Sequence, residues 1–440
     1  MPHSLYWIVL SCAIVANPLQ PHLVGASLAQ HQHPPATPRT PAPDQHQHPS
    51  PSNVTSPVPL GREGSGTSWL PDETPMFAIH GALGEWATMV HGIGFLQYLR
   101  DERPRGERQF GSINWLMISG RRAAAGGQLS LRGMFSLEPL TISDCGYPDL
   151  LASGEVCEGQ PIVDRQHPHD LLMEISATYD RPLSSSLTLQ IYGGVAGEPA
   201  LGPVAFPHRP SALTNPLAPI SHHWLDASHI TFGVVTAAIA DRRWKMEGSL
   251  FNGREPNEER YDINLAALDS YSGRVTFLPT PRVAVQFSAG HLAEAEEHDA
   301  TRVDVDRVTA SAIYHVPRAN GGLWATTLAW GRNQEDGEAT HAVLAESTLS
   351  FADRDIVFGR AEVVQKPSHD LGLEEIDERF NVVKLQIGYA RFLPPFSGWR
   401  AGLGGSVSLG IVPDGLSPTY GGRVTPGIAV FAVVRPAAMH

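Results

Sequence analysis

Residues 399–411 read WRAGLGGSVSLGI, a run in which apolar side chains alternate with polar or small ones. Successive side chains of an extended chain point to opposite faces, so this run has one apolar and one polar face. The same alternation recurs at residues 129–137, 173–180, 187–195, 271–277, 283–289 and 383–389. Only a closed barrel lets such strands face lipid outside and water inside without unpaired backbone groups. The repetition over residues 86–434 therefore predicts an all-β fold, a transmembrane antiparallel β-barrel.

The connections between these segments alternate in length. Short connections are expected at residues 121–127, 181–185, 240–243, 278–282, 317–322, 351–354 and 393–398. Long polar connections are expected at residues 100–107, 144–170, 198–228, 254–264, 293–306, 333–340, 366–379 and 413–422. Short periplasmic turns and longer outside loops are typical of outer-membrane barrels. Counting the segments gives about 16 strands, an even number with both chain ends on the periplasmic side.

Three regions of the chain differ in composition. Residues 1–29 are predicted to be a signal peptide, because an apolar stretch precedes Ser27-Leu28-Ala29, small residues at the usual cleavage spacing. Residues 30–75 are rich in proline and histidine and are predicted to form a disordered tail in the periplasm. Residues 76–440 are predicted to form the barrel. The net charge of −13 argues against nucleic acid as a partner.

Two groups of histidines are candidate metal ligands. The tail group is His31, His33, His46 and His48, and the group in the predicted long loops is His167, His169, Asp170, His208, His222 and His223. Neutral imidazoles together with a carboxylate suit copper, nickel or zinc. The alternative for the tail is a flexible polar linker, and the alternative for the loops is histidines that cap strands at the membrane interface. No cofactor is required by the sequence.

Cysteine usage fits an exported protein. Cys145 and Cys157 lie in one predicted long loop. In an oxidising compartment such a pair is most simply a disulfide that closes a small ring, and a thiol metal site is the alternative.

Charged residues on the polar faces of the predicted strands are expected to line the lumen. A charge that faces lipid at mid-depth costs about 2–4 kcal/mol, so these side chains should point inward. They are Arg132, Glu138, Glu174, Lys245, Glu247, Arg274, Glu346, Arg360, Glu362, Lys384 and Arg400. Aromatic residues near the strand ends, among them Trp115 and Phe392, are predicted to lie in two girdles at the membrane interfaces.

The signal segment, the alternating strands and the order of short turns and long loops resemble Gram-negative porin-like outer-membrane proteins. This resemblance covers residues 86–434 as an architecture. It implies an outer-membrane location in contact with lipid and lipopolysaccharide, insertion by the barrel-assembly machinery, passage of small solutes, and a homo-oligomer. Such proteins usually finish at an aromatic residue, whereas this chain continues past Phe431 to residues 435–440.

Three functions are compatible with the sequence. The first is a polar-lined channel for small solutes or ions. The second is a metal-handling protein that uses the tail and loop histidines. The third is an outer-membrane lipid hydrolase using Ser221 beside His222, or His91 with a serine on a facing strand, but no spacing makes either set specific, so no enzyme activity is predicted. The composition of residues 30–68 also argues against a segment that fills the lumen, and hence against an active siderophore-type transporter.

Overall fold

The computed structural model describes residues 62–102, 104–143, 145–298, 301–373 and 378–439. The predicted signal peptide and residues 30–61 of the predicted tail lie outside the described residues. Within the described ranges, no helix has the length and apolar character needed to span a membrane.

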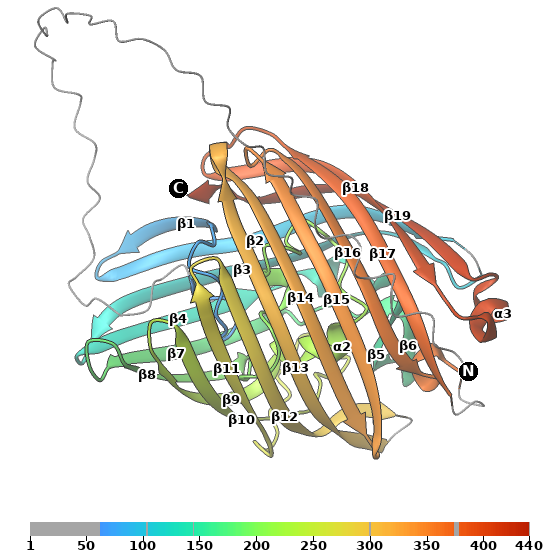
Figure 1. Ribbon diagram of the computed structural model, residues 1–440, viewed down its shortest axis with the longest axis horizontal. Helices are drawn as coiled ribbons and strands as arrows, with labels where there is room; N and C mark the ends of the chain where they lie inside the picture. The colour runs from blue at the N-terminus through green and yellow to red at the C-terminus, as the bar shows by residue number, and fades with distance from the viewer. Residues whose placement is uncertain (1–61, 103, 144, 299–300, 374–377, 440) are drawn as a thin grey trace, which may run out of the picture. The chain divides into compact units, whose positions relative to one another are not determined.

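Sixteen antiparallel strands close into a barrel, as the alternating pattern predicts (Figure 1). Each strand pairs with the next along the chain, and the last, β19, returns to pair with the first, β2. The strands are β2 (Trp86–Asp101), β3 (Arg108–Ala124), β4 (Gly127–Phe135), β7 (Leu172–Pro182), β8 (Thr188–Gly197), β9 (Thr231–Ala240), β10 (Trp244–Phe251), β11 (Ser270–Thr280), β12 (Val283–His298), β13 (Thr301–Arg318), β14 (Gly322–Glu335), β15 (Glu338–Phe351), β16 (Asp355–Pro367), β17 (Arg379–Phe392), β18 (Trp399–Ile411) and β19 (Val424–Pro436).

The seam between β19 and β2 forks at the end of the barrel that carries the short turns. β19 pairs with β2 only from Gly94 to Asp101. The first part of β2 pairs instead with an added strand, β1 (Met76–Leu83). β1 in turn pairs with the two-residue β20 (Ala438–Met439). The residues that follow Phe431 thus form the end of β19 and then β20, and β20 pairs with β1.

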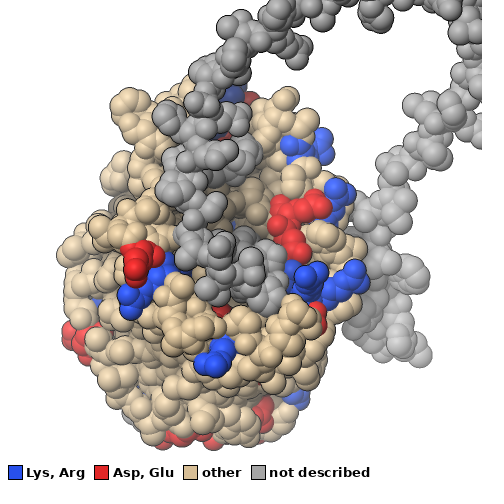
Figure 2. Space-filling model, turned by 90° about the vertical axis from the view of Figure 1, so that its left-hand side faces the viewer, with Lys and Arg blue, Asp and Glu red and all other residues tan. Residues whose placement is uncertain are grey.

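The two faces of each strand follow the predicted alternation. In β18, Leu403 and Val407 are exposed on the outer face, whereas Ser406 and Ser408 are buried inside. Exposed leucine, isoleucine, valine and phenylalanine side chains recur on the outward positions of the other strands. In Figure 2 most of the visible surface is neither acidic nor basic, and charged residues stand in small separate groups. Such a wall is suited to contact with lipid.

All seven short connections lie where the sequence places them, but two predicted long loops are not loops. Residues 293–306 and 333–340 belong mostly to strands, because β12 pairs with β13 as far as His298 and β14 pairs with β15 as far as Glu335. Asp336 and Gly337 alone connect β14 to β15, both with positive φ. Two-residue hairpin turns favour residues with positive φ, and Asp-Gly is a common pair in them. The prediction relied on the polar composition of residues 333–340 and therefore made the loop too long.

The other long connections carry short elements of their own. The β4–β7 connection contains α1 (Glu138–Thr141) and a separate hairpin, β5 (Tyr147–Cys157) and β6 (Gln160–Gln166). The predicted disulfide between Cys145 and Cys157 is confirmed, and it links the segment just before β5 to the last residue of β5. The remaining short helices are η2 (Phe206–His208), α2 (His222–Leu225), η3 (Ala227–His229), η4 (Ala319–Gly321), η5 (His369–Leu371), η6 (Asp414–Leu416) and α3 (Ser417–Tyr420).

Residues 62–75, which were predicted to belong to the tail, are ordered inside the barrel. Trp69 and Leu70 are buried there against interior hydrophobic residues. The prediction that residues 30–68 do not fill the lumen is therefore wrong for residues 62–68. The physical reason is that residues 62–75 include apolar side chains and polar groups that find partners on the inner wall.

The largest interior hydrophobic cluster lies around the seam. It includes Phe95 of β2, Trp115 of β3, Phe392 of β17 and Phe431 of β19. Trp115 and Phe392 were predicted to lie in the interfacial girdles, and this prediction is wrong because both side chains point inward and are buried. The interior near the seam is thus apolar, in contrast to the wall of a water-filled barrel.

Candidate functional site in the barrel interior

The connection between β8 and β9, residues 198–230, passes through the interior and is called the inner loop below. Nearly all of its residues are buried. Its backbone amides at Ala200 and Gly202 donate to Ser249 of β10 and Ser288 of β12, at 2.7 and 2.8 Å. Farther along, Trp224 of α2 donates its indole N–H to Thr340 of β15 at 2.8 Å. The inner loop therefore contacts walls on both sides of its path, and α2 lies within the ring of strands (Figure 1).

Arg209 is the centre of the charged network that holds the inner loop. Its side chain is fully buried, with Nε 2.7 Å from Glu346 Oε1 and Nη1 2.7 Å from Asp226 Oδ2. Arg360 of β16 contacts the other oxygen of Glu346 at 3.1 Å, and Ser211 of the inner loop donates to Glu346 at 2.9 Å. Burial alone would raise the pKa of Asp226, but Arg209 and His222 hold it below its usual range. The network therefore keeps its charges paired.

Further hydrogen bonds continue this attachment along the wall. Asn215 donates to Gln386 of β17 at 2.7 Å, and Ser221 donates to Glu362 of β16 at 2.7 Å. Arg360 also donates to the carbonyl of Leu217 at 2.8 Å. The middle of the inner loop is thus fixed to β15, β16 and β17 by many separate polar contacts.

The β5–β6 hairpin is also attached to this part of the wall, at β17. Lys384 of β17 forms an ion pair with Asp149 and donates to the carbonyl of Leu150 at 2.9 Å. Asp164 of β6 accepts from Arg105, with the two charged groups 2.9 Å apart. Charged groups therefore tie the hairpin to the barrel, and the disulfide closes a ring within the connection itself.

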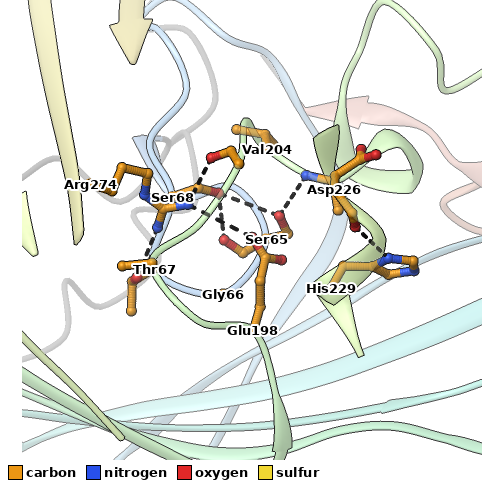
Figure 3. Close-up of polar contacts among 12 residues, drawn as sticks. Ser65, Gly66, Thr67, Ser68, Glu198, Val204, Asp226, His229 and Arg274 are labelled. Atoms are coloured by element: carbon orange, nitrogen blue, oxygen red, sulfur yellow. Dashed lines mark hydrogen bonds and ion pairs between the residues drawn. The ribbon is translucent and has the colours of Figure 1, made fainter. Parts of the chain in front are cut away.

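Residues 62–75, called the N-segment below, contact the inner loop on the side of the interior formed by β10 and β11 (Figure 3). Lys245 of β10 donates to the carbonyl of Thr67 at 2.5 Å, and Arg274 of β11 donates to the Thr67 hydroxyl at 3.0 Å. The Ser65 hydroxyl accepts from the Ala205 amide at 2.8 Å. Between the N-segment and the wall lies a small cavity of about 20 Å³, lined in part by charged wall residues such as Arg132 and Lys245.

Glu198 is the first residue of the inner loop and lies in this same region. It is buried, with its carboxylate 3.9 Å from Arg274. Burial raises the pKa of Glu198 to about 8. The carboxyl group is therefore protonated at neutral pH despite its cationic neighbour.

Ten of the eleven residues predicted to line the lumen lie on barrel strands with their side chains turned inward. They are Arg132, Glu174, Lys245, Glu247, Arg274, Glu346, Arg360, Glu362, Lys384 and Arg400. They contact one another, the N-segment, the inner loop, the hairpin or, for Arg400, the turn residue Asp353, so they do not face an open lumen. The eleventh, Glu138, was expected on a strand and is instead the first residue of α1, because β4 ends at Phe135 and Pro139 follows within the helix.

The loop histidines are brought together in part. The imidazole rings of His167, His222 and His223 lie within 6.4 Å of one another, measured between ring centres. His169 lies 5.3 Å from His229 and its Nδ1 is 3.0 Å from Glu138. His208 is separate and packs on Trp115 with ring centres 4.6 Å apart.

The environments of these histidines differ in charge. Burial lowers the pKa of His167, His222 and His229, so these imidazoles are neutral at pH 7. Burial opposes protonation of His169 too, but Glu138 raises its pKa. Asp170 lies 3.8 Å from Arg260, and burial raises the pKa of Asp170 to about 6.

Metal binding by these groups stays a prediction. Across the described ranges, no three histidine, cysteine, aspartate or glutamate side chains are arranged to hold a metal ion. The tail histidines His31, His33, His46 and His48 lie outside the described residues.

Sequence reasoning missed Arg209, the best-buried charge of the inner loop. Its sequence neighbours are His208 and Pro210, and its partner Glu346 is 137 residues away. The sequence did contain one signal, an arginine within a long proline-rich loop. If such a loop is buried, its guanidinium requires carboxylate partners.

Comparisons with known proteins agree with this fold. No family model and no curated protein matches the sequence. An anion-selective porin from Comamonas acidovorans has a similar structure, with a TM-score of 0.51, 9% identity, and coverage of 80% of this chain and 100% of that one. Salmonella typhi OmpF in complex with daunomycin gives a TM-score of 0.50 and 10% identity, covering 81% of this chain and 100% of that one.

These similarities show the fold: the chain forms an antiparallel β-barrel like those of porins, as the sequence predicts. The outer-membrane location stays a prediction, which this fold supports. Insertion by the barrel-assembly machinery, contact with lipopolysaccharide and assembly into a homo-oligomer stay predictions.

Proposed function

We propose that this protein is an outer-membrane channel for small solutes whose lumen is narrowed by the inner loop and the N-segment. The observation that carries the proposal is the attachment of the inner loop across the interior, from Arg209 to Glu346 and Arg360. A barrel of about 16 strands is wide enough for an aqueous channel when its interior is empty. Here the filling segments are held by polar contacts, and these contacts can be broken without breaking the barrel.

The structural neighbours support the same function. One is described as an anion-selective porin and the other was solved with the small molecule daunomycin. The interior of this chain carries both charge signs on its wall, so we expect the solutes to be small and polar. Catalysis forms no part of the proposal.

The proposal is tested by planar-bilayer conductance of the refolded full chain and of Glu346→Gln. Glu346 pairs with both Arg209 and Arg360, so its loss should loosen the inner loop and raise the conductance several-fold. Glu85→Gln is the matched control, because Glu85 is exposed in the turn between β1 and β2. The control should conduct like the wild type.

A third variant makes the test decisive. Replacement of residues 206–221 by a short glycine-serine linker removes the part of the inner loop that crosses the interior. We expect this variant to conduct best of all. If a folded preparation of this variant and the wild type are both silent in bilayers, the channel function is rejected.

A further inference from the structure

One interior cavity is lined by a different kind of residue from the rest of the wall. It has a volume of about 70 Å³ and lies between β1, β2, β3, the N-segment and the inner loop. Its lining includes the thioethers of Met76, Met89 and Met117 and the imidazoles of His91 and His208. Four of these five residues come from the wall, and His208 comes from the inner loop.

The strand register places the wall residues side by side. Met89 and His91 are two residues apart on β2 and therefore share a face. Met117 of β3 is the direct cross-strand partner of His91. Met76 belongs to β1, which pairs with this part of β2. The three methionines thus come from three adjacent strands.

His91 has a fixed tautomer. Its Nδ1 lies 2.6 Å from the carbonyl oxygen of Phe77. A carbonyl oxygen can only accept, so Nδ1 carries the proton and Nε2 keeps its lone pair. Histidines that ligate metals through one nitrogen commonly hold the other against a carbonyl or carboxylate in this way.

His208 completes the set from the inner loop. Its ring lies 5.9 Å from the ring of His91 and 4.6 Å from Trp115. His208 lines the same cavity as His91, so the two imidazoles reach it from the inner loop and from the wall. The two histidines and Trp115 therefore form one aromatic cluster at the cavity, since His91 is also 4.8 Å from Trp115.

The donor set discriminates among metals. Thioether sulfur is a soft ligand that binds Cu(I) and is a poor ligand for Mg(II), Ca(II) or Mn(II). All five donors are neutral, so a single positive charge is easier to bury here than a double one. Glu63 also lines the cavity, and its carboxylate forms an ion pair with Arg121.

Hydrophobic packing alone explains this cavity less well than ion binding does. Methionine is a common gap filler in cores, and such packing leaves few voids. Here three methionines and two histidines line one side-chain cavity, together with apolar residues such as Leu70 and Leu213, and the cavity is large enough for an ion. The residues that face the lumen of an outer-membrane barrel are in addition usually polar.

We propose that Met76, Met89, Met117, His91 and His208 form a binding site for a soft monovalent metal ion, Cu(I) or its analogue Ag(I). The site is distinct from the loop histidines around His222. Because His208 lies on the inner loop and the other ligands on the wall, a bound ion would join the loop to the wall. The proposal does not depend on whether the channel conducts.

The test is competition for Cu(I) between the purified full chain and a chromogenic Cu(I) chelator under reducing conditions. The wild type should withdraw one equivalent that the double variant Met89→Leu/Met117→Leu does not withdraw. Leucine keeps the apolar volume but removes the sulfur, so the fold should survive. Met134→Leu is the matched control, because Met134 is buried in the same hydrophobic cluster but does not line the cavity.

Two further readouts separate a metal site from a structural effect. X-ray absorption of the Cu(I)-loaded wild type should show more than one sulfur ligand, and the sulfur signal should fall in the double variant, which keeps only Met76. His208→Asn should weaken Cu(I) binding at least about tenfold while leaving Zn(II) binding unchanged. Equal Cu(I) uptake by wild type and double variant, or an equal loss in Met134→Leu, would overturn the proposal, with folding verified by heat-modifiable gel mobility.

Discussion

At the scale of single residues, the interior depends on a few buried charges whose partners lie far away in sequence. Arg209 is fully buried and is shared between Asp226 and Glu346. A guanidinium cannot give up its proton at accessible pH, so it must be paired. The pairing offsets the cost of burying three charges, and removal of one partner leaves the others uncompensated.

Replacing this arginine should therefore be strongly destabilising. Arg209→Met keeps much of the side-chain volume but leaves the carboxylates of Asp226 and Glu346 buried near one another. We expect a loss of about 3–5 kcal/mol in the free energy of unfolding, measured by urea titration in lipid vesicles. Arg282→Met, which removes an exposed ion pair with Glu73, should unfold like the wild type. Equal stability of both variants would contradict the role given to Arg209.

Glu198 should make stability depend on pH. Its pKa is raised by burial from 4.5 to about 8 in the folded protein. Above pH 4.5 the unfolded chain releases this proton while the folded chain retains it, so the unfolded state binds fewer protons. Stability should consequently fall as pH rises from 4.5 to 8, with a slope of about 1.4 kcal/mol per pH unit from this group.

The matched variant is Glu198→Gln, which has the same shape and no titrating proton. The difference in unfolding free energy between wild type and variant should change over pH 5–8 and become constant above about pH 8. A constant difference over the whole range would show that Glu198 does not titrate as described.

At the scale of elements, the strands and short turns could be predicted because they depend on local alternation. Residues 333–340 were misassigned because a polar hairpin tip and a polar loop have the same composition, and only the register of β14 with β15 distinguishes them. The path of the inner loop could not be predicted, since Arg209 and Glu346 are 137 residues apart. His91 was considered only for a hydrolase, and its neighbour Met117 could not be grouped with it, because strand pairing, not sequence spacing, brings β2 and β3 together.

The β5–β6 hairpin should depend on its disulfide. Cys145 and Cys157 are separated by 12 positions, and opening a ring of this size costs about 3 kcal/mol in chain-entropy terms. In Cys145→Ser/Cys157→Ser we expect faster proteolysis between β5 and β6 while the barrel keeps its folded gel mobility. Reduction of the wild type should reproduce this cleavage. Unchanged proteolysis in both cases would mean that Lys384 and Arg105 hold the hairpin unaided.

At the scale of the whole molecule, the interior is divided into two parts. The wall from β10 to β15 carries buried polar side chains such as Lys245, Arg274 and Glu346, which meet the N-segment and the inner loop. The wall around the seam carries Phe95, Trp115 and Phe431. The cavity lined by methionine and histidine lies on the apolar part. One barrel thus offers two chemical environments, and the inner loop contacts both.

The outer wall gives the most direct test of the whole architecture. Val407 lies near the middle of β18 with its side chain exposed on the outer face, and Ser408 beside it points inward. If the barrel spans a bilayer, Val407→Lys places a charge in hydrocarbon and should cost about 2–4 kcal/mol in unfolding free energy in vesicles. Leu83→Lys, at the turn end of β1, should cost no more than about 1 kcal/mol, because its side chain is near the interface. In detergent micelles that deform around a charge, the gap between the two variants should shrink. Equal penalties in vesicles would contradict a membrane-spanning wall, since depth in the bilayer is the property that distinguishes these two exposed positions.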